Sequence, residues 1–355
     1  MSGFLLEKYR GISPYVPGEQ PKEAGYIKLN TNESPFPPSE KARERYMQAF
    51  DKLNLYNDPE NGTLTGAIAE EFGLKRENVL VTNGSDEALA FIYMAYAEKG
   101  KPFAAPEVSY GFYPVFSRLV GADIVTKPLK EDLTVDAEAF AKCDLNVIFA
   151  NPNAQTGTFM PISDIEKIAK KRSRLVVVDE AYVDFGAESA VALIRKYPNI
   201  VVVRTFSKSR SLAGARIGFV IAAEDIVADL KLVKYSFNPY NLGRAAEAAA
   251  TGAFEDKEYF DTCREKIIEA REYTLRRAEA LGLRVIRGKA NFLLMCSEDI
   301  DGGELKNRLY DEKIIVRHFS SPALLSPYIR VTIGSMDEMK TFIKVLEKIL
   351  SGVRK

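Results

Sequence analysis

The sequence predicts an α/β fold, with a large domain on a mostly parallel sheet followed by a smaller α+β domain. Three observations predict it. Between about residues 60 and 240, short apolar segments alternate with amphipathic ones, as in strand–helix–strand units. Most of the apolar segments are β-branched and hydrophobic throughout, which suits strands covered by helices on both faces. After about residue 245 the alternation gives way to a long amphipathic segment and then to short apolar ones.

The large domain is expected to hold a seven-stranded sheet between helices. Helices are predicted over 85–100 and 162–173, where apolar residues recur at helical spacing. The expected strands are the apolar segments 78–83, 101–106, 122–129, 146–152, 174–181, 199–205 and 216–222.

The second domain begins with a long predicted helix over 253–282. Its residues Phe260, Cys263, Ile267 and Ala270 lie three and four positions apart, and Gly282 ends it. The segments LRVIRG, ANFLLMCS, KIIVRHF and YIRVTIG then read as strands, and MDEMKTFIKVLEKILSG as a closing helix. We therefore expect an N-terminal arm over 1–30, a large domain over 31–245 and a small domain over 246–355.

Composition excludes several classes of protein. The 49 basic and 49 acidic side chains cancel, so no basic field points to nucleic acid or to a membrane surface. No apolar run is long enough to span a bilayer, and the first residues lack the layout of a secretion signal. The cysteines, Cys143, Cys263 and Cys296, fit no zinc or disulfide spacing, which indicates thiols in a reducing compartment. We expect a cytoplasmic protein.

The only histidine is His318. A Ser-His-Asp triad and a multi-histidine metal site are therefore strongly disfavoured, and no metal is expected. We interpret His318 as a loop or partly packed residue. Acid–base chemistry in this chain then falls to Lys, Tyr, Asp or Glu, or to a cofactor.

The segment VTNGSDEAL (81–89) joins a predicted strand to a predicted helix. Free amides at a helix N-terminus favour phosphate, and Gly84 lets the backbone approach a ligand closely. The alternative is a plain helix start capped by Ser85 or Asp86. By itself the motif favours the plain cap.

Two more polar segments follow predicted strands. Asn151, in FANPNAQTG, either donates to a ligand oxygen or belongs to an Asn-Pro turn. Asp179 follows three valines, where a carboxylate is costly to bury without a cationic partner such as a protonated ring nitrogen. Tyr182 lies three residues further and can face the same ligand. A helix cap or a metal-binding carboxylate are the alternatives for Asp179.

The fourth segment is FSKSRSLAGARIGF (206–219), directly after the predicted strand 199–205. A desolvated amine at Lys208 would lose proton affinity and become a nucleophile toward an aldehyde. Ser207 and Arg216 can add contacts to a phosphate. The alternative is a solvated turn. Ligands of open α/β sheets bind at this edge, so the four segments together describe a ligand with a phosphate, a phenolic oxygen, a pyridinium nitrogen and an aldehyde. Pyridoxal 5'-phosphate has these groups.

The sequence resembles the fold-type-I, pyridoxal-phosphate-dependent aminotransferases. Within that group it is similar to the histidinol-phosphate aminotransferase family over nearly the whole chain. Each segment alone is weak, but their order and spacing are specific. They are PYVPG (14–18), LNTNESP (29–35), YNDPENGTL (56–64), TNGSDEAL (82–89), PEVSYGFY (106–113), NPNAQTG (151–157), DEAYVDF (179–185), FSKSRSLAGARIGF (206–219) and YIRVTIG (328–334).

The resemblance implies roles for individual residues. Lys208 would bond to the cofactor aldehyde and move the proton during catalysis, and Asp179 would pair with the ring nitrogen. Asn151 and Tyr182 would hold the phenolic oxygen, and Tyr110 would stack on the ring. The expected phosphate ligands are Ser85, Asp86, Ser207 and Arg216.

The resemblance also implies partners. Tyr56 would reach the cofactor of a neighbouring subunit, so a homodimer with shared active sites is expected. The residues expected to meet the substrate are Tyr15, Asn32, Arg317 and Arg330. One departure stands out: the family usually reads NPNNPTG, and here Ala154 and Gln155 replace the second Asn-Pro pair. Because Asn151 is retained, we expect cofactor binding to be retained.

The expected activity is transamination between histidinol phosphate and 2-oxoglutarate, a step of histidine biosynthesis. An aromatic amino-acid aminotransferase is one alternative. A threonine-phosphate decarboxylase, a lyase of similar sequence, is another, because the motifs do not distinguish loss of a proton from loss of a carboxylate. A non-catalytic regulatory module is disfavoured, since the chain keeps both Lys208 and Asp179.

Overall fold

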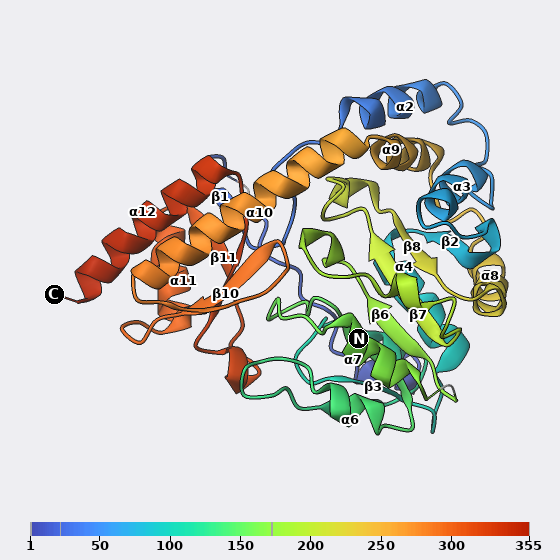
Figure 1. Ribbon diagram of the computed structural model, residues 1–355, viewed down its shortest axis with the longest axis horizontal. Helices are drawn as coiled ribbons and strands as arrows, with labels where there is room; N and C mark the ends of the chain where they lie inside the picture. The colour runs from blue at the N-terminus through green and yellow to red at the C-terminus, as the bar shows by residue number, and fades with distance from the viewer. Residues whose placement is uncertain (1, 22, 172, 355) are drawn as a thin grey trace.

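The computed structural model describes residues 2–21, 23–171 and 173–354. Residues 1 and 22 of the expected arm, residue 172 of the helix expected over 162–173, and residue 355 lie outside the described residues. The described residues form one sheet of seven strands and one of five, each at the centre of a domain. In Figure 1 the large domain lies on the right and the small domain on the left, with a long helix running between them.

The large sheet is mostly parallel, as expected. Strand β8 runs antiparallel to both of its neighbours, β2 and β7, and the remaining pairs are parallel. Because two reversals cancel, β2 points the same way as β7. The order of the strands is β2 (Val79–Thr82), β8 (Gly218–Ile221), β7 (Ile200–Thr205), β6 (Val176–Asp179), β5 (Asn146–Ala150), β3 (Phe103–Pro106) and β4 (Ile124–Lys127).

Helices cover both faces of this sheet, which explains why its strands are apolar at successive positions. In β6, Val176 and Val178 belong to the core on one face and Val177 to the core on the other. The first face is covered by α3 (Gly62–Glu71), α6 (Ala137–Ala141) and α7 (Ile162–Ala169), and the second by α4 (Gly84–Tyr96), α5 (Tyr113–Leu119) and α8 (Glu224–Phe237).

The small domain is built on a mixed sheet. Its strands lie in the order β1 (Ile27–Leu29), β11 (Ile314–His318), β12 (Ile329–Thr332), β10 (Phe292–Cys296) and β9 (Arg284–Ile286). Strand β1 pairs in parallel with β11, so residues 27–29 are part of the small domain. The arm expected over 1–30 is therefore too long at its C-terminal end.

The helix expected over 253–282 is two helices, α9 (Arg244–Glu255) and α10 (Lys257–Ala280). The break falls at Asp256, whose carboxylate accepts a hydrogen bond from the Tyr259 amide at 3.3 Å and caps α10. Residues 255–258 are all charged, and the apolar spacing that predicted the helix begins only after them, at Phe260.

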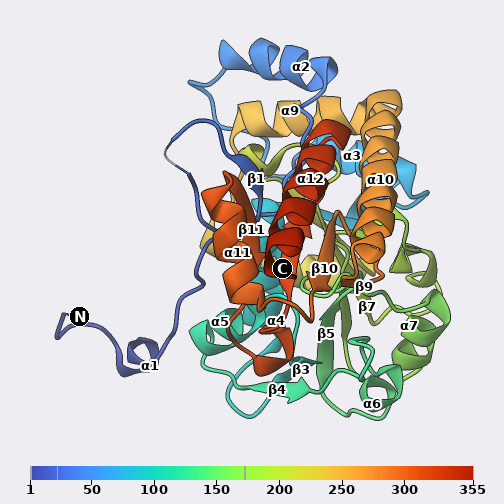
Figure 2. The same cartoon turned by 90° about the vertical axis from the view of Figure 1, so that its left-hand side faces the viewer.

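The boundary between the domains lies inside α10 rather than at residue 246. Helix α9 packs on α2 (Glu40–Phe50) and α3 of the large domain. Phe254 belongs to the large-domain core, whereas Ile267 belongs to the core of the small domain. In Figure 2, α2 and α9 lie together at the top of the molecule, and α10 runs down from that end.

The other helices are α1 (Glu7–Arg10), α11 (Gly302–Asp311) and α12 (Met336–Val353), and short 3-10 turns occupy Arg76–Asn78, Val183–Phe185, Ala190–Leu193, Ala213–Ala215 and Ala323–Leu325. Among the described residues, none of the helices is both long enough and apolar enough to cross a membrane. The carboxyl ends of β2, β5, β6 and β7 all meet at one edge of the large sheet. That edge faces the small domain and carries the four segments singled out in the sequence.

Candidate active site

Lys208 lies three residues beyond the end of β7, between the two domains. Its Nζ donates to the carbonyl of Thr31 at 3.2 Å and lies 5.8 Å from the ring centre of Tyr182. Burial, with the nearby charge of Arg330, lowers the pKa of Lys208 to about 8. A larger share of this amine is therefore uncharged near neutral pH than for a solvated lysine, as a nucleophile requires.

Asp179 is the last residue of β6 and is buried. Its Oδ2 accepts a hydrogen bond from Tyr113 Oη at 2.9 Å, and its Oδ1 accepts one from the Ala181 amide at 3.2 Å. Burial raises the pKa of Asp179 to about 6, although these two hydrogen bonds act in the opposite direction. Within the described residues it forms no ion pair. A cationic group on a ligand would therefore stabilise the ionised form of Asp179, because no cationic side chain among the described residues pairs with it.

The N-terminus of α4 forms a cradle for an anion. Gly84 takes a positive φ of 74°, and the Asn83 side chain does not cap the helix. Arg216 donates from Nη2 to the Asp86 carboxylate at 3.1 Å and from Nη1 to Ser207 Oγ at 3.2 Å. The structure thus brings the predicted phosphate ligands together from two segments, 81–89 and 206–219. Free helix amides beside an arginine fit a phosphate.

Gly218 makes this cradle possible. A Cβ at Gly218 would lie 2.5 Å from the amide nitrogen of Ser85, far closer than van der Waals contact. Only glycine therefore lets β8 pass directly beneath the start of α4. Tyr110 completes the wall, because its Oη donates to Asp86 Oδ1 at 2.7 Å.

Tyr182 is buried, and its Oη accepts a hydrogen bond from Asn32 Nδ2 at 3.1 Å. Asn32 Oδ1 in turn accepts from Thr332 Oγ1 at 3.0 Å, which ties the phenol to the small domain. Burial raises the pKa of Tyr182, so the phenol stays protonated and can donate to a ligand oxygen.

Asn151 fastens the loop that follows β5. Its Nδ2 donates to the carbonyl of Met160 at 3.1 Å, and its Oδ1 accepts from the Met160 amide at 2.7 Å. A carboxamide nitrogen carries two hydrogens, so one N–H of Asn151 is left for the ligand oxygen expected from the sequence, and that contact stays a prediction.

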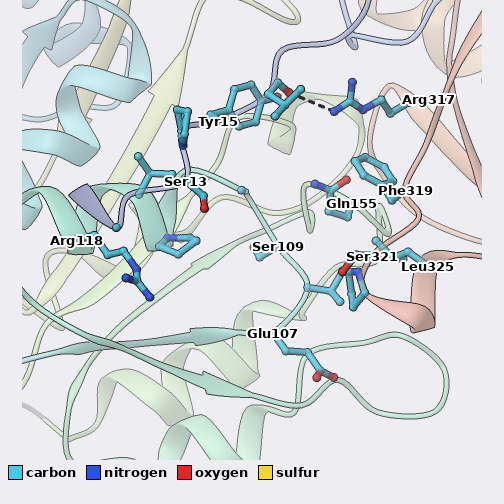
Figure 3. A pocket seen from close by; sticks show the side chains of 18 residues that line it. Ser13, Tyr15, Glu107, Ser109, Arg118, Gln155, Arg317, Phe319, Ser321 and Leu325 are labelled. Atoms are coloured by element: carbon cyan, nitrogen blue, oxygen red, sulfur yellow. Dashed lines mark hydrogen bonds between the residues drawn. The ribbon is translucent and has the colours of Figure 1, made fainter. Parts of the chain in front are cut away.

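Two connected cavities lie at this edge of the sheet. The inner chamber, about 140 Å³, is bordered by Lys208, Tyr182, Tyr110, Asn32 and Arg330, among others. The outer chamber, about 650 Å³, lies beneath the N-terminal arm and is drawn in Figure 3. Residues that border both chambers are Tyr15, Gln155, Arg317 and Phe319.

Two arginines give the chambers a positive charge. Arg317 and Arg330 are cross-strand partners on β11 and β12, and each guanidinium carbon lies 5.3 Å from the ring centre of Phe319. Arg317 donates to the arm carbonyls of Val16 and Pro17, both at 3.2 Å. Within the described residues neither arginine forms an ion pair, which suits an anionic substrate.

Tyr56 and His318 do not border the inner chamber. Tyr56 is 80% exposed, and its ring stacks on Tyr240 with 4.6 Å between ring centres. It is not among the described residues that border Lys208 in its own chain. His318 contacts the carbonyl of Ser326 through Nε2 at 2.9 Å, in keeping with a packed residue.

Three contributors were missed from the sequence. No role was predicted for Tyr113 from the sequence, yet its hydroxyl donates to the Asp179 carboxylate. Thr31 contributes its backbone carbonyl, and a backbone contact cannot be predicted from the type of the residue. Gln155 was recognised only as a departure from the family pattern, and its contact with Arg330 depends on the fold. A search for tyrosines near the buried carboxylate could have found Tyr113.

A mostly parallel seven-stranded sheet, a lysine of lowered pKa after β7, a buried carboxylate at the end of β6 and an anion cradle at α4 define a fold-type-I pyridoxal-phosphate enzyme. The known relatives agree with this class. The model of the family described as aminotransferase class I and II matches residues 24–346. The chain belongs to this family.

Similar proteins and structures cover almost the whole chain. A histidinol-phosphate aminotransferase of Brachyspira hyodysenteriae is 43% identical over 99% of this chain and 100% of its own length. One of Clostridium acetobutylicum is 42% identical over 99% and 100%. The crystal structure of histidinol-phosphate aminotransferase from Sinorhizobium meliloti in complex with pyridoxal-5'-phosphate has a TM-score of 0.88 and 25% identity, with 99% of both chains covered.

Proposed function

We propose that this chain transfers the amino group of histidinol phosphate to 2-oxoglutarate, with pyridoxal phosphate as cofactor. The observation that carries the proposal is the inner chamber, where Lys208 lies beside Arg317 and Arg330. A substrate that has both an amine and an anionic group fits this combination. The named activity of relatives at 42–43% identity over the full chain supports the choice of histidinol phosphate.

The residues assigned to the cofactor come from the carboxyl end of β6 and from the segments that follow β2, β6 and β7. The free amides of α4, with Ser207 and Arg216, would hold the phosphate. Asp179 would accept a hydrogen bond from the ring nitrogen and keep it protonated, and Tyr182 would donate to the phenolic oxygen. When bound, pyridoxal phosphate supplies an aldehyde for amines and a ring that draws electrons from the substrate carbon.

Lys208 has two tasks in this proposal. Its amine, uncharged in part because of the lowered pKa, would hold the cofactor through its aldehyde, with loss of water. Once displaced by the substrate amine, Nζ would take the proton from the amine-bearing carbon and deliver it to the former aldehyde carbon of the cofactor. The carbonyl of Thr31, which accepts from Nζ at 3.2 Å, orients the lysine between these tasks.

Arg330 and Arg317 would bind the anionic group of each substrate. Histidinol phosphate carries a phosphate monoester, and 2-oxoglutarate carries two carboxylates, so both substrates offer an anion to the same arginines. The arm residue Tyr15, stacked on Phe112 with ring centres 4.4 Å apart, borders both chambers and would keep water from the reacting carbon.

We also propose that the chain acts as a homodimer in the cytoplasm. Large apolar side chains are exposed along the end of α2 and the loop that follows it, including Met47 (59%), Phe50 (56%), Leu55 (57%) and Tyr56 (80%). A patch of this kind indicates a protein interface, and a second subunit would explain why Tyr56 does not reach its own Lys208. Light scattering that gave only monomer mass would contradict the dimer.

Product analysis tests the proposed reaction. The holoenzyme would be given histidinol phosphate, phenylalanine or threonine phosphate, each with 2-oxoglutarate, and glutamate, keto product and carbon dioxide would be measured. The proposal predicts glutamate and the keto phosphate from histidinol phosphate at the highest kcat/KM. Preference for phenylalanine would replace it with an aromatic aminotransferase, and carbon dioxide release without glutamate would replace it with a lyase.

A further inference from the structure

Ser209, the residue directly after Lys208, is tied to the segment that follows the neighbouring strand. It is buried, and its Oγ donates a hydrogen bond to the Asp184 carboxylate at 2.5 Å. Asp184 lies in the 3-10 turn Val183–Phe185, which follows β6. Because β6 and β7 are parallel neighbours, this bond links the segment that carries Lys208 to the segment that carries Asp179.

Asp184 is kept ionised by Arg204, a residue of β7. The Arg204 Nη2 donates to Asp184 Oδ1, while the Ser209 hydroxyl donates to Oδ2. Burial raises the pKa of Asp184, but the charge of Arg204 and the hydrogen bond from Ser209 outweigh it, so the pKa lies below its ordinary value. A carboxylate only accepts, so the direction of the hydroxyl is set. A charge-assisted hydrogen bond is roughly twice as strong as one between neutral groups.

The rest of the loop that carries the lysine has anchors of its own. Ser207 Oγ accepts from Arg216 Nη1 at 3.2 Å, and Ser211 Oγ donates to Ser34 Oγ at 2.8 Å. Loss of the Ser209 bond would therefore leave the loop and the phosphate cradle in place. It would free mainly the peptide next to the lysine.

We propose that Ser209 is a positioning residue that orients the amine of Lys208 toward the cofactor aldehyde. Its bond to Asp184 holds the backbone directly after the lysine, so the side chain leaves that backbone in one direction. A displacement of about 1 Å at a reacting group can slow a reaction about 100-fold, so a bond at the adjacent residue is enough to change the rate. This inference rests on the proposed function, in which Lys208 bonds to the cofactor.

Cofactor capture by the cofactor-free protein tests the proposal without turnover. Pyridoxal phosphate has the aldehyde that would bond to Lys208, whereas pyridoxamine phosphate has an amine in its place and binds only through its other contacts. We expect Ser209→Ala to capture pyridoxal phosphate about tenfold more slowly in stopped-flow absorbance. Its affinity for pyridoxamine phosphate, measured by calorimetry, should stay within about twofold of the wild type. In turnover, kcat should fall about tenfold and the KM of the amine substrate should change by less than about twofold.

Ser189→Ala is the matched control. The Ser189 Oγ donates to the buried Glu180 carboxylate at 2.7 Å, and Glu180 Oε2 lies 3.6 Å from Arg204 Nε. This variant loses the same kind of bond in the same group of charges, at a residue that is not adjacent to the lysine. It should lose as much stability in urea unfolding as Ser209→Ala and yet capture pyridoxal phosphate at the wild-type rate. Equal slowing in both variants would mean a general loosening of the charged groups and would overturn the proposal.

A double variant tests whether Ser209 acts through Asp184. Asp184→Ala removes the acceptor, while Glu180 remains as a carboxylate partner for Arg204, so the fold should be retained. If the two residues act through one bond, Asp184→Ala and the double variant should capture pyridoxal phosphate as slowly as Ser209→Ala. Losses that multiply in the double variant would overturn the proposal. Equal weakening of both cofactor forms in Ser209→Ala would do the same.

Chemical trapping separates this inference from the proposed function. If borohydride fixes the cofactor on a lysine other than Lys208, the role proposed for Lys208 fails, and this inference fails with it. If the cofactor is fixed on Lys208 and Ser209→Ala captures it at the wild-type rate, only this inference fails. If Ser209→Ala slows capture but the wild type does not convert histidinol phosphate, only the proposed substrate fails.

Discussion

Replacing Asp179 with asparagine should stabilise the protein without cofactor and weaken its hold on the cofactor. The pKa of Asp179 is raised from 3.8 to about 6, so the folded chain binds this proton more tightly than the unfolded chain. As pH rises from about 4 through about 6, the unfolded state releases the proton first and the free energy of unfolding falls. Two pKa units correspond to about 3 kcal/mol.

Asparagine removes this cost but keeps only one acceptor oxygen for Tyr113 and Ala181. Losing one of the two hydrogen bonds costs about 1 kcal/mol, so we expect a net gain of about 2 kcal/mol at pH 7 and a loss of about 1 kcal/mol at pH 4. Urea unfolding of the cofactor-free wild type and Asp179→Asn at the two pH values measures the difference. In the same variant, affinity for pyridoxal phosphate should fall about 10- to 100-fold, because a charge-assisted hydrogen bond to the ring nitrogen is lost.

The reasoning fails if Asp179→Asn has the wild-type stability at both pH values and binds the cofactor as tightly. It also fails if the variant is less stable at pH 7 by the amount seen at pH 4. That result would mean that the Asp179 carboxylate affects stability only through its hydrogen bonds, and that burial does not destabilise its ionised form.

Three further variants test the surroundings of the cofactor site. Tyr113→Phe removes a hydrogen bond to the ionised form of Asp179, so this carboxyl should titrate above pH 6. Cofactor affinity at neutral pH should then fall about tenfold in equilibrium dialysis, and unchanged affinity would refute this. Arg216→Met should weaken pyridoxal phosphate about 10- to 100-fold but pyridoxal much less, since only the former carries the phosphate, and equal losses would place Arg216 elsewhere. Gly218→Ala puts a Cβ 2.5 Å from the Ser85 amide and should cost about 1–3 kcal/mol in urea unfolding; a neutral result would mean that the cradle can widen.

Local patterns in the sequence were enough to predict the large sheet. Its strands are apolar at successive positions because both faces are covered, and this signal needs no knowledge of partners. Lys208 and Asp179 were predicted for a related reason, because a charged residue at or just beyond the end of a buried strand is unusual. Arg216 was predicted from its place in the same segment as Lys208 and from the order of the motifs, which matches a known family.

Features that depend on long-range contacts were not predictable in this way. Strand β1 joins β11 across almost the whole chain, a pairing that no local pattern indicates. Tyr113 shows the same limit at the site. No pattern in the sequence predicted a role for it, yet its hydroxyl donates to the Asp179 carboxylate.

Chemical trapping of the cofactor on its lysine tests the central claim most directly. The holoenzyme would be reduced with borohydride, digested and analysed by peptide mass spectrometry, with Lys208→Ala treated in parallel. We predict one pyridoxyl phosphate group per chain, on Lys208, and none in the variant. A stable cofactor adduct on a different lysine, or a wild-type protein that captures no cofactor at all, would contradict the account.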